Sequence, residues 1–92
     1  MPNARNPWYV YLLRCSDGSI YTGISKDVDT RVKKHNAGAG AVYTAQRRPV
    51  SLIYQERHRN QSSAMVRERQ IKRLRKAQKE VLALGSPRLH SQ

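Results

Sequence analysis

Residues 8–25 read WYVYLLRCSDGSIYTGIS, and this stretch carries the pattern from which the fold can be predicted. The run at 8–14 is rich in aromatic and β-branched residues, which favours a strand, and residues 20–24 have a similar character. Between them, residues 16–19 read SDGS, and the glycine can adopt the positive φ that a tight turn needs. The stretch therefore predicts a β-hairpin.

Alternation along the two strands divides their side chains between the two faces of a sheet. On the first strand Tyr11 points to one face and Val10 to the other, and on the second Tyr21 and Ile20 separate in the same way. Two tyrosines are therefore expected on neighbouring strands. Tyrosines in a small sheet are more often packing residues than catalytic ones, so neither indicates chemistry by itself.

Beyond the hairpin, the chain predicts a helix, a third strand and a helical C-terminal region. A helix is expected over residues 28–35, where Asp27 suits the partial positive charge of its N-terminus. Residues 37–48 are expected to form a loop, 50–56 a strand, and 64–84 one helix or two. The order ββαβα(α) predicts the α+β class, with a small three-stranded antiparallel sheet flanked by helices.

Length and composition limit the organisation of the chain. Ninety-two residues suffice for one hydrophobic core, expected over 8–84, with flexible ends at 1–7 and 85–92. Cys15 is the only cysteine, which excludes an internal disulfide and suits a reducing compartment. No apolar stretch approaches the ~20 residues of a membrane span, and no secretory signal pattern is present. We therefore expect a cytoplasmic monomer.

The charge of the chain is strongly positive. Eighteen Lys and Arg oppose six Asp and Glu, for a net charge of +12, and such a chain attracts polyanions. A membrane-surface role is disfavoured because the basic helical region lacks a large aromatic face. We expect binding to nucleic acid, with DNA favoured, and a merely solvated charged face is the alternative. The side chains expected to track the phosphate backbone are Lys33, Lys34, Arg47, Arg48, Lys72, Arg73 and Lys76.

Glu68 occupies an unusual position in the predicted C-terminal helix. It falls one turn after Ala64 and three residues before Ile71, inside an apolar arc that also includes Met65. A carboxylate in that place is costly unless a cation compensates it. The cation can be Lys72 at i+4 or a divalent metal ion, and spacing alone favours the ion pair.

Arg31 and His35 share a face of the predicted helix at 28–35, because they are four residues apart. Val28 and Val32 lie on the same arc, so both polar side chains are expected to border the sheet. The alternative is that Arg31 is an ordinary surface cation and that His35 only interacts favourably with the helix C-terminus. Spacing alone favours this alternative.

The joint pattern is more specific than its parts. Tyr-x-Tyr at 9–11, Tyr-x-Gly at 21–23, a helix with Arg31 and His35, and a later helical Glu68 resemble the GIY-YIG nuclease superfamily. The likeness is greatest to its small stand-alone bacterial branch, which is similar to the nuclease domain of an excision-repair enzyme. The segments LLRCSDGSIYTGIS, RRPVSLIY and IKRL are typical of that branch.

This resemblance implies a function and a set of roles. It implies hydrolysis of phosphodiester bonds in DNA, with a preference for structure or strandedness, in repair or processing. Tyr11 would be the general base, with a pKa lowered by nearby cations, and Tyr21 would position the phosphate. Arg31 would hold phosphate oxygens, His35 would orient a tyrosine or relay its proton, and Glu68 would bind one Mg²⁺ or Mn²⁺. A non-catalytic basic module that binds DNA or RNA, and a degenerate nuclease that acts through a protein partner, remain the alternatives.

The chain departs from the family pattern at a few positions. The first motif has Tyr9 and Val10 where the family name has glycine and isoleucine, and the second has Thr22 in place of isoleucine. None of these changes removes a catalytic group. Many relatives also have an asparagine after the metal-binding glutamate, and here no asparagine follows Asn60.

Overall fold

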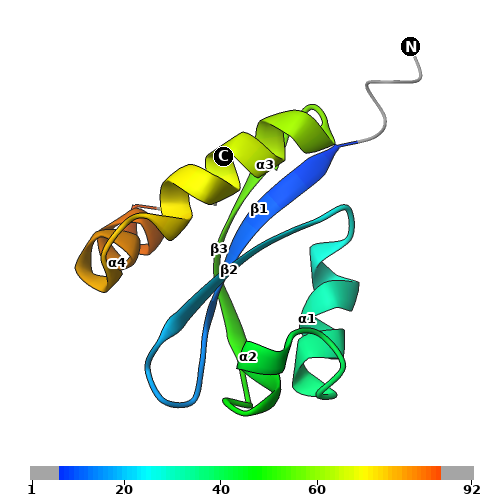
Figure 1. Cartoon of the computed structure of the whole chain (residues 1–92), viewed down its shortest axis with the longest axis vertical. Helices are drawn as coiled ribbons and strands as arrows, with labels where there is room; N and C mark the ends of the chain where they lie inside the picture. The colour runs from blue at the N-terminus through cyan, green and yellow to red at the C-terminus, as the bar shows by residue number, and fades with distance from the viewer. Residues whose placement is uncertain (1–6, 86–92) are drawn as a thin grey trace.

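A computed structural model of the chain describes residues 7–85, and its elements follow the predicted order (Figure 1). They are β1 (Trp8–Arg14), β2 (Ile20–Ser25), α1 (Val28–Asn36), α2 (Val42–Ala45), β3 (Ser51–His58), α3 (Gln61–Lys72) and α4 (Lys76–Leu84). The predicted α+β class is confirmed. The flexible ends that we expected fall almost wholly on residues 1–6 and 86–92, which lie outside the described residues.

The first strand is the centre of the sheet. The strand order is β2-β1-β3, and β1 pairs with both neighbours in antiparallel fashion. In this register Tyr11 lies opposite Gly23 on β2 and opposite Gln55 on β3. A side chain on β1 is therefore flanked on both sides, and its environment depends on what each edge strand presents.

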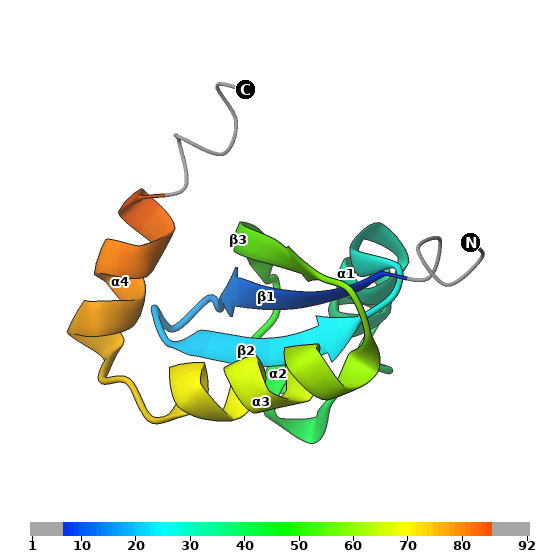
Figure 2. The same cartoon turned by 90° about the horizontal axis from the view of Figure 1, so that it is seen from above.

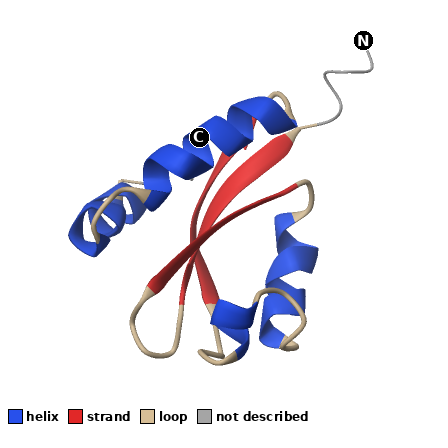
Figure 3. Cartoon of the chain, viewed as in Figure 1, coloured by secondary structure: helices blue, strands red, loops and turns tan. Residues whose placement is uncertain are grey.

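Helices cover both faces of this sheet, with α3 on one side and α1 and α2 on the other (Figures 1 and 3). The view from above shows α3 running alongside β2, with α4 at the end of the molecule away from α1 (Figure 2). The hydrophobic core is therefore divided into two clusters, one on each face of the sheet. Val10, Leu12, Ile20, Ala64 and Ile71 form the cluster beneath α3, and Tyr11, Leu13, Cys15, Val28 and Val50 form the cluster beneath α1. The predicted alternation along β1 is confirmed.

Side-chain caps set the starts of the two helices that carry polar site residues. Asp27 precedes α1 and accepts a hydrogen bond from the backbone N–H of Thr30 at 3.1 Å. Asn60 precedes α3 and accepts from the backbone N–H of Ser63 at 2.9 Å. Such caps typically contribute ~1 kcal/mol each to stability. They fix which residues of α1 and α3 face the sheet.

The structure corrects several boundaries. The expected loop at 37–48 contains the short helix α2, which is too brief to produce a periodic sequence pattern. The third strand begins at Ser51 and continues to His58, past the expected end at residue 56. The C-terminal region is two helices, because the backbone becomes extended at Arg75 (φ −75°, ψ 162°). Met65 is exposed, so placing it in the apolar arc of α3 was wrong.

The second C-terminal helix is tied to the sheet by a charged pair. Both terminal nitrogens of Arg14 donate to the carboxylate of Glu80, at 2.8 and 2.6 Å, and Leu82 packs against the cluster beneath α3. Among the helices that the structure describes, none combines the length and the apolar character needed to cross a bilayer.

Candidate active site

The phenol of Tyr11 is buried between β1, β2 and α1. The residue is 1% exposed, and its hydroxyl lies 2.9 Å from Nε2 of His35. The Tyr11 side chain can lie against β2 because Gly23, its partner on that strand, has no Cβ. A Cβ added at Gly23 would lie 2.5 Å from the Tyr11 hydroxyl oxygen. The strand pairing therefore brings a phenol and an imidazole from distant parts of the sequence into contact.

His35 is enclosed in the last turn of α1. Its exposed fraction is 0%, and its Nδ1 lies 2.7 Å from the hydroxyl oxygen of Thr44 on α2. Gly40 lies so close to the imidazole that a Cβ at that position would overlap the ring. Burial, and then the positive charge of Arg31, lower the pKa of His35 below its usual value of 6.5. The imidazole is therefore neutral at physiological pH.

The acidity of Tyr11 differs from our expectation. Burial is the main cause that raises the pKa of Tyr11 from 10.0 to about 12. The guanidinium of Arg31 acts in the opposite direction but does not overcome burial, and the charges of Tyr21 and Glu68 raise the pKa further. The expectation that nearby cations lower the pKa of Tyr11 was wrong, because desolvation outweighs the single guanidinium. The pKa of Tyr11 thus responds to the charges of Arg31 and Glu68, which shift it in opposite directions.

Tyr21 lies beside the Tyr11–His35 pair and connects it to the surface. Its ring centroid is 6.5 Å from that of Tyr11 and 5.1 Å from that of His35. On its other side the ring stacks with Tyr43, with a centroid separation of 6.1 Å, and the guanidinium of Arg47 lies 3.8 Å above the Tyr43 ring. Tyr21 is half-buried, and Tyr43 is 39% exposed. A stack of aromatic and cationic groups thus leads from the buried pair to solvent.

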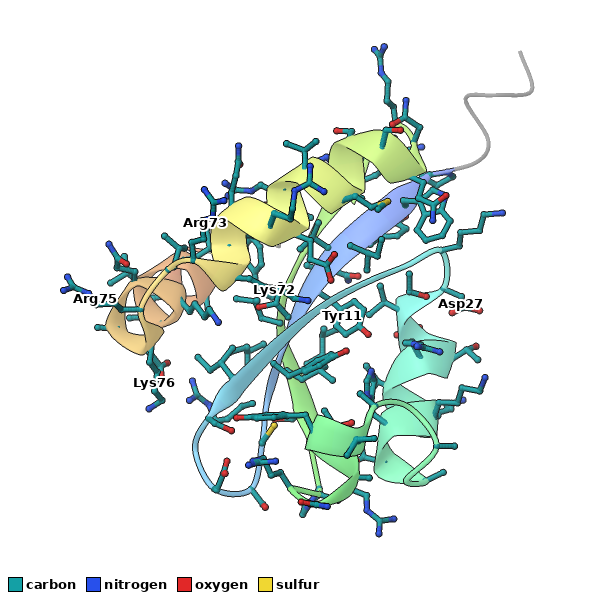
Figure 4. All side chains as sticks on the ribbon, in the orientation of Figure 1. Tyr11, Asp27, Lys72, Arg73, Arg75 and Lys76 are labelled. Carbon is teal, nitrogen blue, oxygen red and sulfur yellow. The ribbon has the colours of Figure 1, made fainter. Side chains whose placement is uncertain are left out.

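Glu68 lies on α3 between two buried residues, Ala64 and Ile71, and its side chain is 19% exposed. Its carboxylate pairs with the ammonium group of Lys72 at 3.4 Å, so the ion pair that the spacing favoured is confirmed. Figure 4 shows Lys72 directed from α3 toward the part of the molecule that holds Tyr11. Glu68 therefore has a cationic partner and also acts on Tyr11.

The donors near Tyr11 can be tested for their fit to a metal ion. Within residues 7–85 no group of three or more His, Cys, Asp or Glu side chains is arranged to hold one. Mg²⁺ and Mn²⁺ prefer oxygen ligands, and Mg²⁺ commonly uses only one or two carboxylates and keeps several waters. The carboxylate of Glu68, whose side chain is 19% exposed, fits that requirement as a single protein ligand.

The basic residues predicted to contact nucleic acid are dispersed. Lys33 and Lys34 are exposed on α1. The side chain of Arg47 donates to Asp17 at 3.1 Å, and that of Arg48 donates to the backbone carbonyl of Ala45 at 2.9 Å, so both are held by internal contacts. In Figure 4, Arg73 and Lys76 lie around the turn between α3 and α4, away from Tyr11. Lys72 approaches Glu68, and Arg47 reaches the site through its contact with the Tyr43 ring. The contacts of all seven residues with nucleic acid stay predictions.

Sequence reasoning missed the residues of the site that come from 40–44. Thr44, Tyr43 and Gly40 contact His35 or Tyr21, yet they lie in the stretch that was expected to be a loop. No periodicity or charge pattern marks them, because their importance comes from tertiary contacts with α1 and β2.

The three-stranded sheet flanked by helices, with Tyr11, Tyr21 and His35 brought together from a hairpin and α1, defines the chain as a small α+β domain with a buried polar site. Residues 7–81 match the model of the GIY-YIG catalytic domain. The chain belongs to the GIY-YIG family, and the suspected resemblance is confirmed.

Similar proteins place the chain more narrowly within that family. It is 58% identical over 64 residues to a UPF0213 protein of Staphylococcus aureus, an alignment that covers 70% of this chain and 78% of that protein. The solution NMR structure of the UPF0213 protein BH0048 from Bacillus halodurans matches with 45% identity and a TM-score of 0.53, covering 83% of this chain and 81% of that one. That of the protein EF2693 from E. faecalis matches with 40% identity and a TM-score of 0.60, covering 90% and 88%. These relatives form a small stand-alone group, and their names state no activity.

Proposed function

We propose that this protein is a metal-dependent endonuclease that hydrolyses phosphodiester bonds in DNA, with a preference set by strandedness or branching. The observation that carries the proposal is the hydrogen bond between the Tyr11 hydroxyl and His35 Nε2, at a point where Arg31 and Glu68 also act. A buried tyrosine needs one hydrogen-bond partner for its hydroxyl, but it does not need an arginine and a glutamate nearby as well. Membership of a nuclease family provides independent support. The role in repair or processing is proposed from the resemblance of the sequence to the nuclease domain of an excision-repair enzyme.

Tyr11 acts as a proton relay in the proposed reaction. A water molecule attacks phosphorus in line with the leaving 3′ oxygen and gives its proton to the Tyr11 oxygen, while the Tyr11 proton passes to Nε2 of His35. Because the phenol gains one proton as it loses another, no free tyrosinate forms. This route is compatible with the raised pKa of Tyr11 and with a neutral His35. It replaces the expected tyrosinate base.

Arg31 and Tyr21 hold the substrate in the same proposal. The guanidinium of Arg31 is a planar donor that can bind two phosphate oxygens at once, and Tyr21 positions the phosphate or its neighbour. Nucleases of this family generally use divalent metal ions, and here Glu68 would hold Mg²⁺ or Mn²⁺. When bound, that ion would supply positive charge to stabilise the leaving oxygen. Lys72 must release Glu68 for this, and its ammonium can then pair with the phosphate backbone.

The remaining features agree with an intracellular nucleic-acid enzyme. A net charge of +12 favours binding to the phosphate backbone, and each phosphate neutralised adds ~0.9 to the salt dependence on duplex DNA. Cys15 is a buried free thiol, which suits the reducing cytoplasm. A monomeric state stays a prediction.

Cleavage assays on a panel of substrates test the proposal. Single-stranded, duplex and branched DNA and RNA are incubated with the wild type, Tyr11→Phe and Glu68→Gln, with and without Mg²⁺. We expect cleavage of DNA by the wild type in Mg²⁺ only, and a loss of ~10²-fold or more in each variant, as for other acid–base groups.

Matched variants separate chemistry from folding. Tyr54→Phe removes another hydroxyl whose pKa is raised to about 12 by burial, and Glu80→Gln removes a glutamate that also pairs with a lysine. Both are expected to cleave like the wild type. Cleavage that survives in Glu68→Gln contradicts the proposed site. Mg²⁺-independent binding with no cleavage of any substrate would favour a non-catalytic binding module.

A further inference from the structure

Four groups form one continuous hydrogen-bonded chain beneath the sheet. The Tyr11 hydroxyl meets His35 Nε2 at 2.9 Å, and His35 Nδ1 meets the Thr44 hydroxyl at 2.7 Å. The Thr44 hydroxyl also lies 3.1 Å from the backbone carbonyl oxygen of Ala41. Tyr11, His35 and Thr44 are each at most 1% exposed, so in the free protein their hydrogen-bond partners are other protein groups. Every proton in the chain therefore has a limited choice of acceptor.

The hydrogen bonds that join these four groups can run in two directions, and the two differ in whether every proton has an acceptor. In the first, Thr44 donates to the Ala41 carbonyl, His35 carries its proton on Nδ1 and donates to Thr44, and Tyr11 donates to the bare Nε2. All three protons then have an acceptor. In the second, Thr44 donates to Nδ1 and His35 donates from Nε2 to Tyr11. The Ala41 carbonyl then keeps only its bond from the backbone N–H of Ala45, and the Tyr11 proton has no acceptor among the described residues.

The neighbour of Tyr11 gives a second reason for the first direction. Arg31 acts on the Tyr11 hydroxyl, and a guanidinium can only donate hydrogen bonds. A positive charge near the hydroxyl favours the orientation in which the Tyr11 oxygen faces Arg31 and the Tyr11 proton faces His35. Gly40 packs so closely against the imidazole that an added Cβ would overlap it, so the plane of the ring has little room to tilt.

We propose that Thr44 is a positioning residue that holds the His35 proton on Nδ1 and so keeps Nε2 free to accept the proton of Tyr11. The hydroxyl performs this task because its own proton is committed to the Ala41 carbonyl, which turns its oxygen toward Nδ1 as an acceptor. Thr44 touches neither the substrate nor the reacting atoms. The consequence for cleavage rests on the proposed function, but the tautomer assignment does not.

Nitrogen NMR of the histidine ring tests the assignment directly. The ¹⁵N shifts of the three histidines are recorded near pH 7.5, and His35 is identified by its loss in His35→Gln. We expect the wild type to carry its proton on Nδ1, Thr44→Val to shift toward the Nε2-protonated form, and Thr44→Ser to restore the wild-type spectrum. Valine keeps the shape of threonine without the hydroxyl, and serine keeps the hydroxyl.

Cleavage rates of the same proteins complete the test. We expect Thr44→Val to lower kcat by ~10- to 100-fold with little change in DNA affinity, and Thr44→Ser to stay within ~3-fold of the wild type, as for a residue that orients an acid–base group. A wild-type His35 protonated on Nε2 overturns the inference, even if Thr44→Val does not fold. So does a Thr44→Val protein with an unchanged tautomer. The expected tautomers without cleavage of any nucleic acid would support the assignment and overturn the proposed function instead.

Discussion

Gly23 lies opposite Tyr11 in the β1–β2 ladder, and a Cβ at Gly23 would lie 2.5 Å from the Tyr11 hydroxyl oxygen and 2.7 Å from Cζ. Both distances are shorter than real Cβ contacts. The φ of Gly23 is not positive, so the backbone does not require glycine at this position. The glycine of the second tyrosine motif is therefore needed to make room for the phenol of the first.

Gly23→Ala should displace the Tyr11 phenol from His35. A shift of ~1 Å in a reacting group can cost ~10²-fold in rate, so we expect single-turnover cleavage to fall by about that factor. Gly85→Ala is the matched control, because its φ is −75° and an added Cβ would make only ordinary contacts at 3.5 Å or more. A Gly23→Ala protein that folds and cleaves at the wild-type rate would show that the phenol is not the reacting group.

His35 should make stability depend on pH in the mildly acidic range. Burial lowers its pKa in the folded state, so below about 6.5 the unfolded chain binds a proton that the folded protein resists. The contribution of this group is complete above pH 6.5 and is lost as the pH falls toward the lowered folded pKa. Urea unfolding at pH 7.5 and 5.5 should show a smaller loss of stability in His35→Gln than in the wild type. Equal losses would mean that His35 is not buried as a neutral group.

Lys72 should compete with a metal ion for Glu68. Their pair joins a carboxylate that is 19% exposed to an ammonium that is 54% exposed, and partly exposed pairs contribute ~0.2–1 kcal/mol. Lys72→Met should therefore tighten Mg²⁺ binding by up to ~5-fold in calorimetry without DNA. Lys76→Met removes the same charge from a similar pair with Glu80 at 3.5 Å, and it should have a smaller effect. Equal effects would assign the change to net charge alone.

Thr22 should tolerate loss of its hydroxyl better than Thr44. Both residues are buried, but Thr22 Oγ1 has no hydrogen-bond partner among the described residues, whereas Thr44 Oγ1 has several. An unsatisfied buried polar group costs ~1–3 kcal/mol, so Thr22→Val should raise the free energy of unfolding by about 1 kcal/mol. Thr44→Val should lower it. Denaturant unfolding of the two variants measures both, and the same sign for both would contradict this difference.

The hairpin, its two faces and the start of α1 at Asp27 could be predicted from the sequence because each depends on neighbouring residues. Alternation assigned Tyr11 and Val10 to opposite faces of β1, and the structure confirms this. Glu68 was noticed because a carboxylate interrupts an apolar arc. Each of these predictions depends on residues that are close together in the sequence, and tertiary packing does not change them.

The remaining features depend on contacts between distant segments. The buried environment that raises the pKa of Tyr11 arises from packing between β1 and α1, and the sequence shows the cations but not the desolvation that outweighs them. Thr44 meets His35 only because a short helix folds back under α1. The break at Arg75 has no glycine or proline to mark it.

The location of Tyr11 on the central strand, within the cluster beneath α1, has a consequence for how such a protein would lose function. Tyr11 is both a packed core residue and the proposed proton carrier, so the same side chain would contribute to stability and to catalysis. Heat or denaturant should therefore inactivate the protein only as the whole domain unfolds. Substitutions of Tyr11 would be restricted both by the packing of the core and by the proposed chemistry.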